Sequence, residues 1–134
     1  MSTALRKVFI IEDEQQIREH MLAYFEDFEE FRVDAADCGE LALEMLARDP
    51  ADICIVDIRL PGMDGESFIR AASAAGRCRR FILHTGSVDL IVSEHLCAAG
   101  LSERDVFFKP CGMDLILARV RELLAELAAI DGSA

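Results

Sequence analysis

The chain has 134 residues, of which 52% are hydrophobic and 29% are charged. These values predict one packed globular domain and exclude an intrinsically disordered chain. The formal net charge of −11 would repel a phosphate backbone, so we do not expect this domain alone to bind nucleic acid.

Short apolar runs alternate with segments of helical spacing along the chain. The runs are continuous rather than alternating, which is typical of strands buried on both faces of a parallel sheet. We expect strands at 8–11, 32–36 (the weakest), 53–56, 81–83 and 106–108. Helices are predicted at 14–28, 40–48, 64–75, 88–99 and 113–130.

This regular β-α alternation predicts an α/β fold with a parallel sheet, helices on both faces and right-handed crossovers. The strand order typical of such a five-stranded, doubly wound sheet is 2-1-3-4-5. We expect a single domain over 1–134, with a core of about 7–130, and a ligand crevice at the carboxyl ends of the first and third strands.

Polar residues stand at the carboxyl ends of four predicted strands. Glu12 and Asp13 follow the first strand, Asp57 the third, Thr85 the fourth and Lys109 the fifth. The carboxyl ends of parallel strands share one rim, where three carboxylates would repel each other without a cation. Hard oxygen ligands favour Mg²⁺ or Ca²⁺, and a site with few protein ligands plus waters favours Mg²⁺. A carboxylate nucleophile, a lysine and a hydroxyl around such a metal match the needs of phosphoryl transfer.

The ordered set of motifs resembles the response-regulator receiver family from residue 7 to about 130. The motifs are Glu12-Asp13, Asp57 followed by Leu60-Pro61-Gly62-Met63-Asp64-Gly65, Thr85-Gly86 and Lys109-Pro110. The resemblance implies a flavodoxin-like (βα)5 fold and a role in two-component signalling. The domain would be a switch that catalyses only its own phosphorylation and slow dephosphorylation, and would not be a turnover enzyme.

The resemblance also assigns roles to individual residues. Asp57 would be the phosphoacceptor. Asp13 would bind Mg²⁺ directly, Glu12 directly or through water, and Arg59 through its backbone carbonyl, with Asp57 completing the metal site. Lys109 would pair with a phosphoryl oxygen from a loop with a cis bond to the following proline, and Thr85 would be the switch hydroxyl.

The resemblance implies two kinds of partner, a phosphoryl donor and a downstream output partner. The phosphoryl donor would be a phosphohistidine on a sensor histidine kinase or a histidine phosphotransfer protein. The output would be an effector protein, an output domain or a homodimer, reached through the helix at 88–99, the strand at 106–108 and the helix at 113–130. Leu90, Ile91, Val92 and Leu96 with Val106 and Leu115 are candidates for an apolar patch there.

Two positions depart from the usual family pattern. Val106 stands where the family often has an aromatic residue, three positions before the lysine, and Cys111 stands where a phenylalanine often follows Lys-Pro. Valine is short and stiff at χ1, so it cannot swing as an aromatic side chain does. We therefore expect output without an aromatic rotamer switch.

Three other functions remain as alternatives. A haloacid-dehalogenase-type hydrolase would need a second acid where this chain has Arg59. A receiver-like module that ignores phosphorylation would have lost an acid or the lysine, and a flavodoxin-like cofactor binder would need a hydroxyl-rich loop after the first strand.

The remaining residues favour ordinary structural roles in a cytoplasmic protein. The five cysteines lack ligand spacing and predict reduced thiols without zinc. No apolar run reaches the roughly 18 residues of a membrane span, and no signal peptide is expected. We expect His84 to be packed and hydrogen-bonded, His20 and His95 to lie on helix surfaces, and Arg77, Arg79 and Arg80 to be solvated before the fourth strand.

Overall fold

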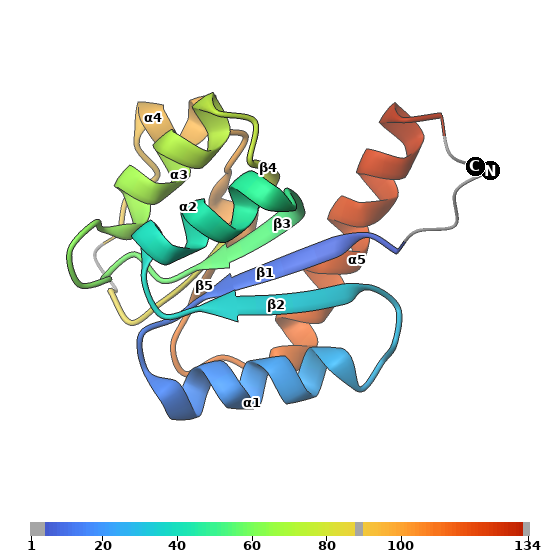
Figure 1. The fold of residues 1–134 in the computed structure, drawn as a ribbon, viewed down its shortest axis with the longest axis horizontal. Helices are drawn as coiled ribbons and strands as arrows, with labels where there is room; N and C mark the ends of the chain where they lie inside the picture. Colours follow the sequence, from blue (N-terminus) through green and yellow to red (C-terminus); the bar gives the residue numbers. More distant parts are fainter. Residues whose placement is uncertain (1–4, 88–89, 133–134) are drawn as a thin grey trace.

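The computed structural model describes residues 5–87 and 90–132. Its five parallel strands are β1 (Lys7–Ile11), β2 (Arg32–Ala36), β3 (Ala51–Val56), β4 (Cys78–Thr85) and β5 (Val106–Phe108). They lie in the order β2-β1-β3-β4-β5, which confirms the predicted topology. Figure 1 shows this single sheet between two layers of helices.

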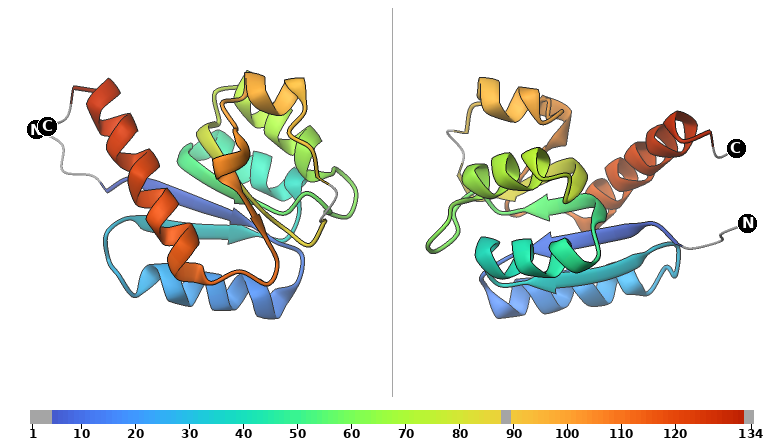
Figure 2. Two further views of the ribbon diagram at one scale, coloured as in Figure 1. Left: turned by 180° about the vertical axis from the view of Figure 1, so that it is seen from behind. Right: turned by 45° about the horizontal axis from the view of Figure 1, so that its top comes forward.

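The helices cover both faces of the sheet. They are α1 (Gln15–Glu26), α2 (Gly39–Arg48), α3 (Gly65–Ala74), α4 (Glu94–Ala98) and α5 (Met113–Ile130), with a short 3-10 turn, η1, at Glu103–Asp105. α1 and α5 pack on one face, and α2, α3 and α4 lie on the other (Figures 1 and 2). The fold is therefore the doubly wound α/β sandwich that the sequence predicts.

Two hydrophobic cores hold these layers together. All five residues of β1 are buried, and successive side chains point to opposite faces. Phe9 and Ile11 join the core beneath α2, α3 and α4, whereas Val8 and Ile10 join the core beneath α1 and α5. The continuous apolar runs are thus explained by burial on both sides, and the strands' carboxyl ends meet at one rim.

The helix predicted at 88–99 is wrong in its first half, as far as the described residues show. Residues 90–93 are not helical, and 88–89 lie outside the described residues. The helix begins after Ser93, whose side chain accepts the backbone N–H of Leu96 at 3.2 Å. Two β-branched residues, Ile91 and Val92, precede this cap and favour extended backbone. Leu96 is buried in the core.

The fourth strand is longer than predicted, and its arginines are not simply solvated. Arg79 and Arg80 lie inside β4. Arg79 donates two hydrogen bonds to Asp131, at 2.8 and 2.9 Å, and Arg80 pairs with Glu126 at 3.0 Å. Arg77 donates to a backbone carbonyl of α2 at 3.0 Å. Arg79 is exposed as expected, but the ion pairs were missed because the acidic partners sit some fifty residues away in sequence, on and just after α5.

Two further expectations can be compared with the structure. All five cysteines are free thiols, as predicted. Within residues 5–87 and 90–132, no helix combines the length and apolar character needed to cross a bilayer.

Candidate functional site

The carboxyl ends of β1 and β3 bring three acids together. Glu12 and Asp57 are only 1% and 7% exposed, whereas Asp13 is exposed. Each offers a carboxylate oxygen, and these oxygens all lie within 4.8 Å of one another. The acids meet because Glu12 and Asp57 end adjacent parallel strands, where Ile11 is paired with Val56. The structure thus gathers the acidic residues that the sequence singled out.

Lys109 reaches the same cluster from the loop between β5 and α5. Its ammonium donates to Glu12 Oε1 at 2.7 Å and to Asp57 Oδ2 at 2.9 Å. Its backbone N–H donates to the carbonyl of Thr85 at 2.8 Å, which fixes the loop to the end of β4. The Lys109–Pro110 peptide bond is cis, as the resemblance implied.

The protonation of this cluster follows from burial and from an excess of acid. Burial raises the pKa of Glu12, and hydrogen bonds from Lys109 and from the Glu14 backbone N–H offset this only in part. Burial alone would lower the pKa of Lys109, but its bonds to Glu12 and Asp57 outweigh burial and raise that pKa. Both directions hold together because two buried carboxylates, those of Glu12 and Asp57, share one ammonium. The site therefore keeps Lys109 charged and favours a further cation.

The two buried acids are also held by backbone donors. Glu12 Oε2 accepts the N–H of Glu14 at 3.2 Å, and Asp57 Oδ1 accepts the N–H of Arg59 at 3.0 Å. Because Lys109 occupies the other oxygen of each, neither carboxylate can rotate freely. Three oxygen-bearing acids in one cluster are the donor set that Mg²⁺ prefers, so the residues present fit this metal.

The hydroxyl of Thr85 lies at the same rim but is engaged locally. Thr85 is fully buried, and its Oγ1 accepts the N–H of Ser87 at 3.1 Å. A Cβ built on the intervening Gly86 would meet nothing within 4 Å, so the loop has room to move there. The Arg59 guanidinium donates to Ser87 Oγ at 3.4 Å and bridges the loops after β3 and β4.

The sequence did not reveal Arg18 as part of this site. Its guanidinium, from α1, donates to the backbone carbonyls of Glu12 at 2.9 Å and Asp13 at 3.4 Å. It thereby holds the loop that carries both acids. A basic residue one turn into the helix after an acidic pair was the available signal, but such residues are common on helix surfaces.

His84 is buried as predicted, but the expectation that it is hydrogen-bonded is wrong for Nδ1. This atom has no partner among the described residues, and the residue is 5% exposed. Burial, and then the nearby Lys109 ammonium, lower the pKa of His84 to about 4. With Ile17, Lys109, Pro110 and Cys111 it lines a pocket of about 350 Å³ beside the acidic cluster.

A doubly wound sheet with an acidic pair, a buried aspartate and a paired lysine at one rim is typical of receiver-like signalling domains. A family model described as the response regulator receiver domain matches residues 8–121, and the chain belongs to this family. Members of this family act as signalling switches of two-component systems.

Several known proteins are similar to this chain. The virulence sensor protein BvgS of Bordetella pertussis is 38% identical over 104 residues, covering 72% of this chain and 8% of that protein. The response regulator MprA of Mycobacterium leprae is 29% identical over 118 residues, covering 88% of this chain and 50% of that protein. The chain thus spans about half the length of MprA and a small part of BvgS.

Solved structures support the same fold. The response regulator StyR matches with a TM-score of 0.84 at 22% identity, covering 97% of this chain and 64% of that one. A signal receiver domain of a putative Luxo repressor protein from Vibrio parahaemolyticus matches with a TM-score of 0.81 at 27% identity, covering 95% and 96%.

Proposed function

We propose that the chain accepts a phosphoryl group on Asp57 in the presence of Mg²⁺ and changes its affinity for a partner as a result. The observation that carries this proposal is the position of the Lys109 ammonium, which bonds both Asp57 and Glu12 beside Asp13. A nucleophilic carboxylate, a metal-binding acid and a fixed cation are then within reach of one phosphoryl group.

Four residues would hold the metal. Asp13 and Asp57 offer carboxylate oxygens, and Arg59 would offer its backbone carbonyl. Glu12 would bind the metal directly or through water. When bound, Mg²⁺ would neutralise charge on the transferring phosphoryl oxygens.

The transfer itself needs few protein groups. A carboxylate oxygen of Asp57 attacks phosphorus, the P–N bond of a donor phosphohistidine breaks, and its electron pair returns to the imidazole. Lys109 holds a phosphoryl oxygen with its ammonium. The donor would be a sensor histidine kinase or a histidine phosphotransfer protein. The apolar pocket lined by Ile17, Pro110 and Cys111 gives such a donor a surface next to Lys109.

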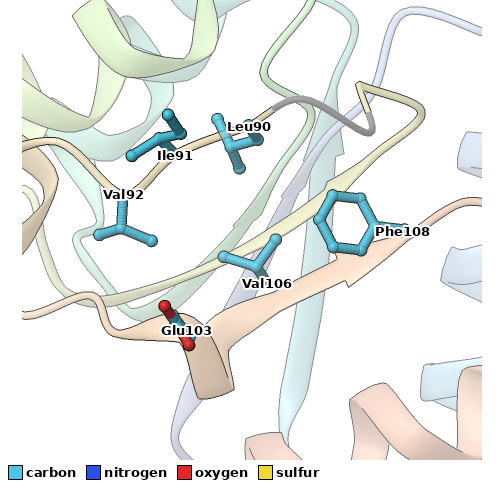
Figure 3. Close-up of a pocket in the computed structure, with 6 residues that line it drawn as sticks. All are labelled: Leu90, Ile91, Val92, Glu103, Val106 and Phe108. Atoms are coloured by element: carbon cyan, nitrogen blue, oxygen red, sulfur yellow. The ribbon is translucent and has the colours of Figure 1, made fainter.

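The phosphorylated state would be read through Thr85 and the surface formed by α4, β5 and α5. The Thr85 hydroxyl, which accepts the Ser87 N–H, would move and donate a hydrogen bond to a phosphoryl oxygen. Beside β5 lies a groove of about 420 Å³, lined by Leu90, Ile91, Val92, Glu103, Val106 and Phe108 (Figure 3). An effector, an output domain or a second copy of the chain would bind this surface.

Residues 1–134 would act as one receiver domain in the cytoplasm, as a switch with slow loss of phosphate. Turnover hydrolysis is disfavoured, because the position two residues after Asp57 holds Arg59 instead of a second acid. The guanidinium of Arg59 donates to Ser87 Oγ and carries only hydrogen-bond donors, so it offers no acceptor for the proton of an attacking water.

The decisive experiment is phosphorylation by acetyl phosphate with Mg²⁺, followed by intact-mass analysis. Wild type should gain one phosphoryl group and Asp57→Asn none. Asp37→Asn, at an exposed position outside the cluster, is a control for the loss of one carboxylate and should behave as wild type. Equal phosphorylation of Asp57→Asn and wild type would refute the assignment.

A further inference from the structure

The first residues of the loop between β3 and α3 are held by several contacts, including the bonds of Asp57 to Lys109 and of Arg59 to Ser87. The N–H of Arg59 donates to Asp57 Oδ1 at 3.0 Å, and the N–H of Gly65 donates to the carbonyl of Ile58 at 2.9 Å. The side chain of Leu60 packs into the core with 8% exposure. These contacts secure the two ends of the loop and one side chain in its middle.

A side chain of α2 bonds the backbone in the second half of this loop. Glu40 stands in the first turn of α2, and its Oε2 accepts the backbone N–H of Met63 at 3.1 Å. A Cβ at Gly62 would lie 2.8 Å from the same oxygen, and Gly62 has φ of +72°. Glycine at this position therefore lets the carboxylate lie directly against the loop backbone.

The methionine packs α2 and the loop together at a second point. A Cβ at Gly39 would lie 3.2 Å from Met63 Sδ and 3.4 Å from its Cγ, so the thioether covers the start of α2. Met63 thus contacts α2 through its side chain and bonds Glu40 through its backbone. This two-point contact holds Glu40 in place although its side chain is exposed.

We propose that Glu40 is a positioning residue for the metal site, acting through the loop that carries the Arg59 carbonyl. This inference rests on the proposed function. Glu40 touches neither the acidic cluster nor Lys109 in the hydrogen bonds of the described residues. A carbonyl ligand binds a metal more tightly when its loop is already ordered, because no ordering entropy is then lost on binding. Without Glu40, the segment around Met63 would lose its bond to α2, and Mg²⁺ binding would have to order that part of the loop.

Three variants separate the hydrogen bond from the charge. Glu40→Ala removes the acceptor and the charge, whereas Glu40→Gln removes the charge and keeps a carbonyl oxygen for the Met63 N–H. Glu44→Ala removes the same charge from an exposed position one turn further along α2. Titration calorimetry of Mg²⁺ on the full chain should give a dissociation constant about three- to tenfold higher in Glu40→Ala. Glu40→Gln and Glu44→Ala should stay within about twofold of wild type.

A second measurement needs no metal. Residue-resolved hydrogen exchange of the Met63 amide in Mg²⁺-free protein should be faster in Glu40→Ala and unchanged in Glu44→Ala. An effect on global stability alone would accelerate exchange throughout the sheet and would not select this amide.

The outcomes separate this inference from the proposed function. If Glu40→Ala binds Mg²⁺ as tightly as Glu44→Ala, or if its Met63 amide keeps its protection, the positioning role is wrong while phosphorylation of Asp57 stands. If wild type binds no Mg²⁺ and gains no phosphoryl group, both proposals fail together.

Discussion

Replacing His84 by leucine should stabilise the protein, and more so at acidic pH. The imidazole is buried on β4, and its Nδ1 lacks a hydrogen-bond partner among the described residues. An unsatisfied buried polar atom costs about 1–3 kcal/mol. Leucine has a similar volume and needs no partner. We therefore expect His84→Leu to raise the free energy of unfolding by about 1 kcal/mol at neutral pH.

The pH dependence follows from the pKa of His84. Burial first, and then Lys109, lower this pKa from 6.5 to about 4 in the folded state. Between these values the unfolded chain binds a proton that the folded chain does not, so stability falls as the pH falls from 6.5 towards 4. Integrated from neutral pH down to about pH 5, the loss in free energy of unfolding is about 2 kcal/mol. The advantage of His84→Leu should therefore grow to about 3 kcal/mol there.

Urea unfolding followed by circular dichroism, at about pH 7.5 and about pH 5, measures this difference. Carboxylates titrate in both proteins and largely cancel when wild type and variant are compared at the same pH. His20→Leu, at an exposed position on α1, is the matched control and should show no such growth. A pH-independent difference between His84→Leu and wild type would refute the reasoning.

Three further predictions address the metal, a buried ion pair and a close backbone approach. Mg²⁺ should raise the melting temperature of wild type in thermal scans but leave that of Asp13→Ala unchanged, because the variant lacks the exposed acid of the cluster. Equal shifts of the two melting temperatures would contradict the metal site. Arg119→Met should lower unfolding free energy in urea by about 3 kcal/mol, because Arg119 bonds the buried carboxylate of Asp105 at 2.7 Å; a loss below about 1 kcal/mol would count against this. Gly65→Ala should lower the free energy of unfolding by more than about 2 kcal/mol in the same assay, because its Cβ would meet a backbone oxygen at 2.4 Å. The Cβ of Gly86→Ala would meet nothing within 4 Å, so this control should leave the free energy of unfolding unchanged.

The sheet and the acidic rim were predictable because they rest on local patterns. Continuous runs of β-branched and aromatic residues identified four of the strands, and β-α alternation predicted the strand order. The carboxyl ends of parallel strands share an edge, so Glu12, Asp57 and Lys109 could be placed together although 97 positions separate the first from the last. The roles of these residues in phosphorylation remain predictions.

What the sequence could not supply are contacts between surface side chains distant along the chain. Glu40 and Met63 are 23 positions apart, and nothing in either local pattern indicates that one bonds the other. The same holds for Arg79 and Asp131, 52 positions apart. The start of α4 was missed for another reason: Val92, Leu96 and Ala99 have helical spacing, but the cap at Ser93 decides where the helix begins.

Lys109 links the acidic cluster to the groove beside β5. Its ammonium bonds Glu12 and Asp57, while its backbone N–H is fixed to the carbonyl of Thr85. The residue before it, Phe108, is exposed at the groove next to Val106 (Figure 3). On the proposed function, a phosphoryl group would draw the ammonium and the Thr85 hydroxyl towards itself, and both movements act on the paired ends of β4 and β5. The valine at 106 therefore removes one mobile aromatic side chain without disconnecting the phosphorylation site from the groove.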